Sequence, residues 1–190
     1  MFVGLRERNA QSNPWYHKGA GGRTRTSREV RSLPEGSKKK GRYTKMSNMF
    51  SLKGKTALIT GAIYGIGFAI AEAYAAQGAK IIFNCLNEKD LEKGYANYKE
   101  KGIDAKGYIC DVTNEEKVQE MVADIEKEFG GIDILVNNAG MIKRIPMLEM
   151  KAEEFRQVVD VDLNGPFIVS KAVIPGMIKQ KHGKIINICS

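Results

Sequence analysis

The chain has 190 residues and a formal net charge of +8 at pH 7, and this length suits one domain with a sizeable core. The excess charge lies in residues 1–45, which hold 12 Lys and Arg against 3 Asp and Glu, whereas the remainder holds 18 against 19. The near-neutral body therefore gives no reason to expect a nucleic-acid partner. No run of about 18 apolar residues occurs, so no membrane span is predicted.

The three cysteines, Cys85, Cys110 and Cys189, lie far apart in the sequence. They form no C-x-x-C motif and no Cys/His cluster, so we predict neither a disulfide framework nor a metal site. A reducing, cytoplasmic setting is the simplest expectation for such a chain.

Residues 1–45 are rich in Gly, Arg, Ser and Lys and lack apolar periodicity. Such a segment buries too little surface to offset its ordering entropy, so we predict a disordered basic extension. It is open to three interpretations: an Arg-rich transit peptide, a basic arm for nucleic acid or membrane surfaces, or translation from an upstream start codon. We favour the third, with a natural start at Met46 or Met49, because the domain pattern begins near Met46 and the extension has no helical moment.

From residue 55 onward, short apolar runs alternate with helical patterns. Residues 65–77 and 88–101 are each followed by a glycine at the position that ends a helix, Gly78 and Gly102. Thr113 and Glu116 have the spacing of a capping box at the start of a third helix. Pro166 is expected to kink a long helical stretch. The expected strands are 55–60, 80–84, 105–110, 132–137 and 184–189, and the expected helices are 65–77, 88–101, 113–129 and 151–180.

This alternation predicts an α/β fold, a doubly wound parallel sheet in three layers, α/β/α. Right-handed crossovers place helices on both faces of such a sheet. Ligands bind outside the carboxyl ends of the strands, near the switch in strand order. The polar segments after the strands are therefore the places to look for function.

The segment 60–67, TGAIYGIG, follows the first strand and precedes the first helix. Gly61, Gly65 and Gly67 let the backbone approach an anion closely, and the helix N-terminus behind them presents free N–H groups. This strand–turn–helix context makes a dinucleotide pyrophosphate the favoured ligand, and an ordinary tight turn is the alternative.

With Thr60 in front, the spacing G-x-x-x-G-x-G resembles the short-chain dehydrogenase/reductase family. The segment 137–140, NNAG, matches an element that this family carries after its fourth strand. The resemblance covers residues 50–190 and implies a Rossmann-type NAD(P)-binding domain over 46–190. It implies that this domain lacks its last strands and helices, and that the full-length form is a homo-oligomer, dimer or tetramer.

The resemblance also assigns residues to the cofactor. The residues implied to line the pyrophosphate, the adenine edge and the riboses are Gly61, Tyr64, Gly65, Ile66, Gly67, Asp111, Val112, Asn138, Ala139 and Gly140. NAD-preferring members usually carry, at the end of the second strand, an acid that binds the ribose 2′-hydroxyl. Cys85 occupies this position here and is the eleventh predicted cofactor residue. NADP-preferring members often carry Arg or Lys there or at the position of Tyr64, so the choice between NAD and NADP stays open.

The family's chemistry uses a Ser, a Tyr and a Lys four residues after the Tyr, together with an Asn on the long helix. Ser190 matches the Ser, and the Tyr-x-x-x-Lys element expected about a dozen residues later is absent. The same spacing in 95–99 (YANYK) falls in the wrong place, and we interpret it as a solvated helix face. We expect the chain as printed to turn over no sugar acid.

Asp162 aligns with the family's Asn. The helical spacing puts it on one face with Phe155 and Val158, so we expect it to be partly buried, in a catalytic role or bonded to the kinked helix.

Three stretches, 140–147, 161–173 and 187–190, resemble the gluconate 5-dehydrogenases of the family and imply a sugar-acid substrate. Lys143 and Arg144 have the chemistry to hold its carboxylate, although two solvated surface cations are the slightly favoured alternative. The competing functions are a 3-oxoacyl carrier-protein reductase and a dinucleotide-binding module without catalysis.

Overall fold

A computed structural model describes residues 49–189. The predicted extension, residues 1–45, and Ser190 lie outside this range. Within residues 49–189, no helix is both long enough and apolar enough to cross a membrane.

Strands and helices alternate along the described chain as the sequence predicts. In chain order they are β1 (Thr56–Ile59), α2 (Gly65–Ala76), β2 (Lys80–Cys85), α3 (Glu88–Glu100), β3 (Ala105–Ile109), α4 (Glu115–Phe129), β4 (Ile134–Asn137), α5 (Ala152–Val159), a π-helical segment (Asp160–Asn164), α6 (Gly165–Lys179) and β5 (Lys184–Asn187).

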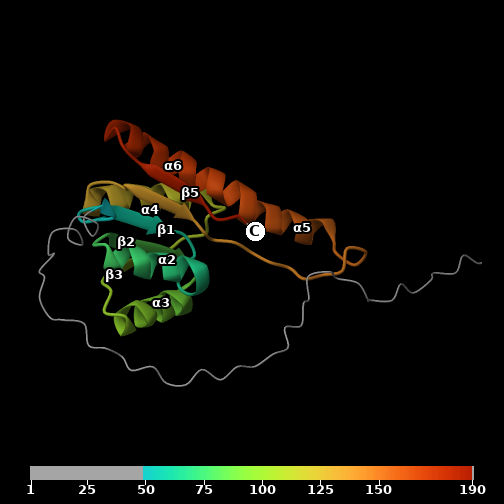
Figure 1. Ribbon diagram of the computed structural model, residues 1–190. Helices are drawn as coiled ribbons and strands as arrows, with labels where there is room; N and C mark the ends of the chain where they lie inside the picture. The colour runs from blue at the N-terminus through green and yellow to red at the C-terminus, as the bar shows by residue number, and fades with distance from the viewer. Residues whose placement is uncertain (1–48, 190) are drawn as a thin grey trace, which may run out of the picture. The chain divides into compact units, whose positions relative to one another are not determined.

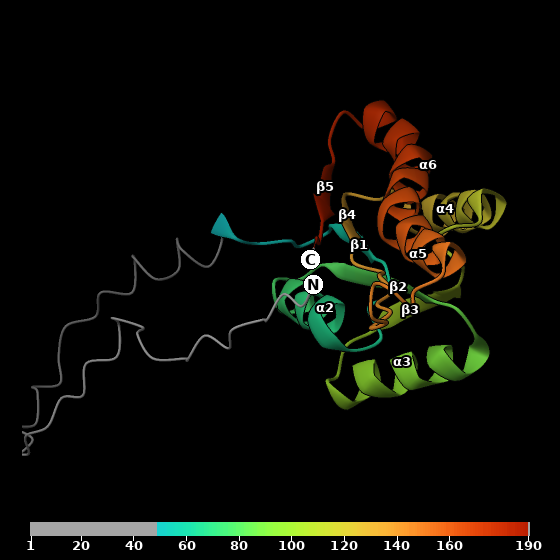
Figure 2. The same cartoon turned by 90° about the vertical axis from the view of Figure 1, so that its right-hand side faces the viewer.

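The five strands form one parallel sheet in the order β3-β2-β1-β4-β5. Figure 1 shows α2 and α3 below this sheet and α4 and α6 above it, and the quarter turn in Figure 2 shows the same three layers. The predicted doubly wound α/β fold is therefore confirmed. The strand order reverses between β1 and β4, so the carboxyl ends of these two strands form the edge where ligands bind in such sheets.

Alternate residues of the central strands pack into two separate cores. Leu58, Ile82 and Leu135 point to the core under α4 and α6, which is filled by residues such as Val118 and Val173. Their neighbours along the same strands belong to the second core under α2 and α3. This two-sided burial explains why the strands are continuous apolar runs and do not alternate with polar residues. β5 lies at the sheet edge, and its residues are exposed.

The first turn of α4 corrects one sequence prediction. Asn114, not Thr113, caps this helix, and its side chain accepts a hydrogen bond from Lys117 N at 3.0 Å. The hydroxyl of Thr113 instead donates to Asp111 Oδ1 at 2.8 Å. Thr113 and Asn114 are both good capping residues. The hydrogen bond to Asp111 occupies the Thr113 hydroxyl, and Asn114 caps the helix.

The long helical stretch is broken next to Pro166, as predicted. The break is a π-helical segment in which Gly165 N donates to Asp160 O, five residues back. Pro166, the second residue of the regular helix α6, has no N–H for the ordinary helical bond at this point.

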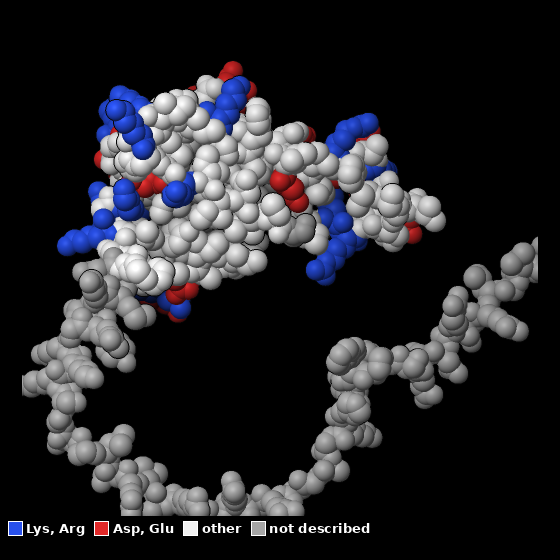
Figure 3. Space-filling model, turned by 45° about the horizontal axis from the view of Figure 1, so that its top comes forward, with Lys and Arg blue, Asp and Glu red and all other residues white. Residues whose placement is uncertain are grey.

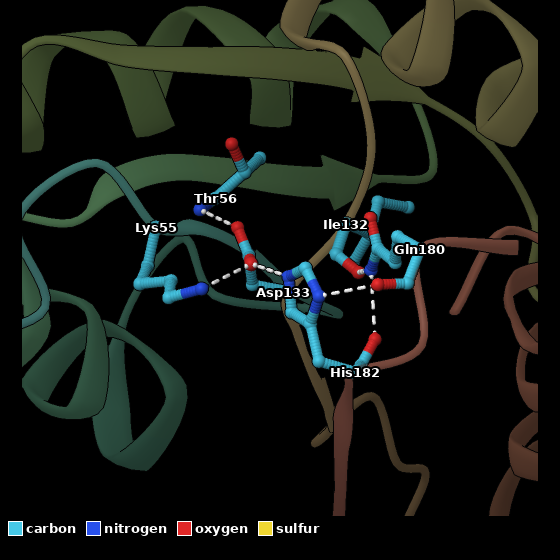
Figure 4. Close-up of polar contacts among 6 residues, drawn as sticks. All are labelled: Lys55, Thr56, Ile132, Asp133, Gln180 and His182. Atoms are coloured by element: carbon cyan, nitrogen blue, oxygen red, sulfur yellow. Dashed lines mark hydrogen bonds and ion pairs between the residues drawn. The ribbon is translucent and has the colours of Figure 1, made fainter. Parts of the chain in front are cut away.

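A polar cluster ties the strands together at the edge opposite the predicted ligand site (Figure 4). The Asp133 carboxylate accepts from Lys55 Nζ and Thr56 N, both at 2.8 Å, and contacts His182 Nε2 at 2.6 Å. Partial burial raises the pKa of Asp133, but these hydrogen bonds outweigh burial and hold the pKa below its ordinary value. The cluster joins the starts of β1 and β4 to the turn that leads into β5.

Candidate functional site

The glycine-rich turn leaves the N-terminus of α2 open. Gly61 and Gly65 have φ angles of +63° and +66°, which L side chains rarely adopt. Tyr64 makes no side-chain cap and no acid lies in the first turn of α2, whereas α3 and α4 have both a side-chain cap and acids there. The first amides of α2 therefore remain available to an anion.

The NNAG segment is bonded directly to this turn. Thr60 Oγ1 accepts from Asn138 N and Ala139 N, both at 2.9 Å, and Asn138 Nδ2 donates to Thr60 O at 2.9 Å. A Cβ on Gly67 would lie 2.4 Å from Asn138 Nδ2, and a Cβ on Gly61 would lie 2.9 Å from Ala139 Cα. The two motifs, far apart in sequence, thus form one structural unit that requires both glycines.

Asn84, at the carboxyl end of β2, connects the turn to the end of β3. Its Oδ1 accepts from Gly61 N at 3.0 Å, and its Nδ2 donates to Cys110 O at 2.7 Å. Asn84 is 2% exposed, so both bonds replace contacts with water. We did not predict a role for Asn84 from the sequence, although a polar side chain in the otherwise apolar run KIIFN indicates one.

Helix α3 supports the turn from below. Tyr98 is 1% exposed and its hydroxyl donates to Ala62 O at 2.7 Å, while Asn97 Nδ2 donates to Ile63 O at 2.8 Å. Burial, with a smaller contribution from Glu72, raises the pKa of Tyr98, so the hydroxyl remains a donor. The interpretation of 95–99 as a solvated face was therefore wrong for Tyr98, whose role is to support the turn.

A cavity of about 470 Å³ opens at this edge of the sheet. It brings together ten of the eleven predicted cofactor residues, and the eleventh, Gly67, packs against Asn138 behind it. Six further residues complete the wall. The lining consists of Gly61, Ile63, Tyr64, Gly65, Ile66, Asn84, Cys85, Leu86, Asp90, Asp111, Val112, Asn138, Ala139, Gly140, Met141 and Val161.

The wall near β2 and β3 differs in polarity from residue to residue. Asp111 is exposed and its Oδ1 also accepts from Thr113 N at 2.9 Å, whereas Val112 is buried. Cys85 is 5% exposed, and its thiol lies near the carbonyl oxygens of Asn87 and Tyr108, at 3.4 and 3.6 Å. Burial raises the pKa of Cys85, so the thiol acts here as a small apolar group and a weak donor.

Asp162 is exposed, which corrects the prediction of partial burial. The π-helical segment changes the angular position of the residues after 160, so α-helical spacing from Phe155 misplaces this side chain. Asp162 Oδ1 accepts from Met141 N at 2.8 Å. It therefore holds the segment after NNAG at the mouth of the cavity, beside the lining residues Met141 and Val161.

The two predicted substrate residues lie away from the cavity wall. Lys143 donates a short hydrogen bond to Gln157 of α5, and Arg144 is exposed. Ser190, the other predicted catalytic residue besides Asp162, lies outside the described residues.

Comparison with known proteins identifies relatives across the described domain. The short chain dehydrogenase family model matches residues 55–190. A 2-dehydro-3-deoxy-D-gluconate 5-dehydrogenase of Formosa agariphila is 49% identical over 144 residues, which cover 75% of this chain and 54% of that relative. A 3-oxoacyl-[acyl-carrier-protein] reductase of Vibrio cholerae is 43% identical over 140 residues, 74% of this chain and 56% of that relative.

Solved structures show the same similarity. The 2-keto-3-deoxy-D-gluconate dehydrogenase of Streptococcus agalactiae is 61% identical with a TM-score of 0.70, covering 78% of this chain and 56% of that one. A gluconate 5-dehydrogenase of Burkholderia cenocepacia, solved with NADP and tartrate, is 38% identical with a TM-score of 0.70, covering 76% and 57%. The chain thus spans little more than half the length of the relatives it matches.

Proposed function

Because the chain belongs to the short-chain dehydrogenase family, whose members are NAD(P)-dependent oxidoreductases, we propose that the cavity described above binds the nicotinamide dinucleotide. The pyrophosphate would lie on the turn from Gly61 to Gly67. The adenosine would lie toward Asp111 and Val112, and the nicotinamide end toward Asn138 and Gly140. The chemistry that this cofactor supplies is hydride transfer.

One observation carries the proposal: the uncapped N-terminus of α2 opens onto the cavity. A Cβ added to Gly65 would meet nothing within 4 Å, so the space beside this backbone is free for an anion. The N–H groups and the positive end of the helix dipole favour the pyrophosphate there. Thr60 and Asn84 hold the turn in this shape before any ligand binds, which lowers the ordering cost of binding.

A matched pair of glycine substitutions tests this site. Gly65 and Gly102 have nearly the same φ, +66° and +67°, and both face open space, but only Gly65 lines the cavity. Ala at either position should lower the free energy of unfolding by a similar amount, about 1–2 kcal/mol. We expect Gly65→Ala to weaken NAD(P) binding at least about tenfold in calorimetry, because its Cβ occupies the anion position. Equal binding by both variants would contradict the proposed site.

For the whole protein, we propose a sugar-acid substrate: oxidation of a hydroxyl, or reduction of a keto group, on a molecule such as gluconate or 5-keto-gluconate. The names of several relatives support this, and so does the resemblance of 140–147 to gluconate 5-dehydrogenases. The reductase of Vibrio cholerae supports the alternative, a 3-oxoacyl carrier-protein substrate. Rates of NAD(P)H oxidation by a full-length form with 5-keto-gluconate and with a 3-oxoacyl thioester separate the two.

Four residues remain candidates for the chemistry. We propose Ser190 as the catalytic hydroxyl and Asp162 as a group near the nicotinamide end, supported by its bond to Met141. Lys143 and Arg144 remain the candidates for the substrate carboxylate. This assignment requires Lys143 to leave Gln157. A Gln157→Ala variant of the full-length form should therefore have an equal or lower KM for sugar acid, whereas Arg144→Ala should raise it.

We also propose that the full-length form is a homo-oligomer. Large apolar side chains along α5, the π-helical segment and α6 are exposed: Phe155 at 59%, Leu163 and Phe167 at 66%, and Ile178 at 71%. Figure 3 shows charged side chains gathered toward the two ends of the described part, with a mostly uncharged expanse between them. Such a surface is typical of protein interfaces.

Free thiols at Cys85, Cys110 and Cys189 support a reducing, cytoplasmic location.

A further inference from the structure

The cavity wall carries negative charge where β2 meets α3. Of the residues that line the cavity, only Asp90 and Asp111 are charged, and both are acidic. Asp90 lies in the first turn of α3, five residues past Cys85. Dinucleotide folds place the acid that binds the ribose 2′-hydroxyl at the end of the second strand, and Cys85 occupies that position here.

The side chain of Asp90 is held at this position by the helix cap. Asn87 Nδ2 donates to Asp90 Oδ2 at 2.8 Å, and Asp90 N donates to Asn87 Oδ1 at 2.9 Å. Within residues 49–189, no protein donor reaches the second oxygen, Oδ1. This oxygen is therefore a free acceptor on a carboxylate that lines the cavity.

Neither Cys85 nor Lys93 gives the cavity a preference for NADP. The thiol of Cys85 lies against the carbonyls of Asn87 and Tyr108, so it offers no acceptor to a ribose. Lys93 has its Nζ 5.4 Å from the centre of the Tyr64 ring, but it is not part of the cavity wall.

We propose that Asp90 makes this chain select NAD over NADP. A carboxylate accepts a hydrogen bond from the 2′-hydroxyl of NAD and repels the 2′-phosphate of NADP, which carries nearly two negative charges. The inference rests on the proposed dinucleotide site and names the residue that discriminates within it. Asp90 takes the place of the missing acid at Cys85.

Calorimetric titration of the chain with NAD⁺ and NADP⁺ tests the selection. The pair AMP and adenosine 2′,5′-bisphosphate tests it on the adenosine half alone. We expect NAD⁺ to bind at least about tenfold more tightly than NADP⁺. Asp90→Asn keeps an oxygen for the Asn87 amide, and it should reduce this difference to about threefold or less by strengthening NADP⁺ binding. Glu92→Gln removes a charge from the same helix away from the cavity, and it should leave the difference unchanged.

Equal affinity for the two dinucleotides, or an unchanged difference in Asp90→Asn, would overturn the inference. Preference for NADP⁺ that disappears in Lys93→Gln would assign selection to Lys93 instead. If neither dinucleotide nor either adenosine fragment binds to a chain whose circular dichroism shows it folded, the proposed cofactor site itself is wrong. That result differs from loss of selectivity with binding retained.

Discussion

Replacing Tyr98 with Phe removes one buried hydroxyl and tests whether α3 supports the glycine-rich turn. The ring would stay in place, because Phe68 and Phe83 pack against it with ring centroids 4.8 and 4.9 Å away. The lost bond joins the hydroxyl to Ala62 O at 2.7 Å, and Ala62 is fully buried. The Ala62 carbonyl would remain without its partner and without water, which costs about 1–3 kcal/mol.

Urea unfolding of the wild-type chain and of Tyr98→Phe measures this difference in the free energy of unfolding. We expect the midpoint to fall with an unchanged m-value, because the surface exposed on unfolding stays the same. Tyr74→Phe is the control: within residues 49–189 the hydroxyl of Tyr74 has no hydrogen-bond partner, so the free energy of unfolding should change by less than about 0.5 kcal/mol. A similarly small change for Tyr98→Phe would refute the supporting role of Tyr98.

Three further substitutions or truncations test other parts of the account. Asn84→Ala leaves Gly61 N and Cys110 O without partners and should cost about 2–4 kcal/mol in urea unfolding; a loss under 1 kcal/mol would contradict the bridge. Asp133→Asn should be less stable at pH 7, and because the folded pKa of Asp133 is lowered, the difference from wild type should persist above about pH 4 and shrink as pH falls below it. A difference independent of pH down to 2 would argue against the charge. Removing residues 1–45 should change the free energy of unfolding, measured by thermal denaturation, by less than about 1 kcal/mol.

Much of the fold and of the cofactor site could be predicted because the relevant signals are local. Gly61 and Gly65 lie between a strand and a helix, and their positive φ angles are ones that glycine adopts far more readily than other residues. The NNAG segment was predicted separately as a second motif. That Thr60 Oγ1 joins the two could not be read from spacing, because the bond depends on the pairing of β1 with β4.

The errors arose where one local pattern had two solutions. Thr113 and Asn114 were both suitable caps, and only the contact with Asp111 separated them. Asp162 was placed by α-helical spacing, which a π-helical turn invalidates. Tyr98 lies in a polar helix whose composition suggested solvent exposure, although Leu91, Gly94 and Tyr98 share a helix face. Gly94 lies against the Phe83 ring, and that packing is a tertiary property.

The place of Asp90 on the cavity wall could not be predicted for a related reason. Asp90 lies in the first turn of α3, and its position follows from the way Asn87 caps that helix. The end of β2, where an acid is expected, carries Cys85.

The most direct test of the central claim is amide hydrogen exchange of the 190-residue chain with and without saturating NAD⁺ or NADP⁺. We predict slower exchange at residues 61–67 and 138–140, because the dinucleotide would cover the N-terminus of α2 and the NNAG segment. We predict no change around Asp133 at the opposite edge. Absence of protection at 61–67 in a folded chain, or protection confined to another surface, would contradict the proposal that this cavity holds the cofactor.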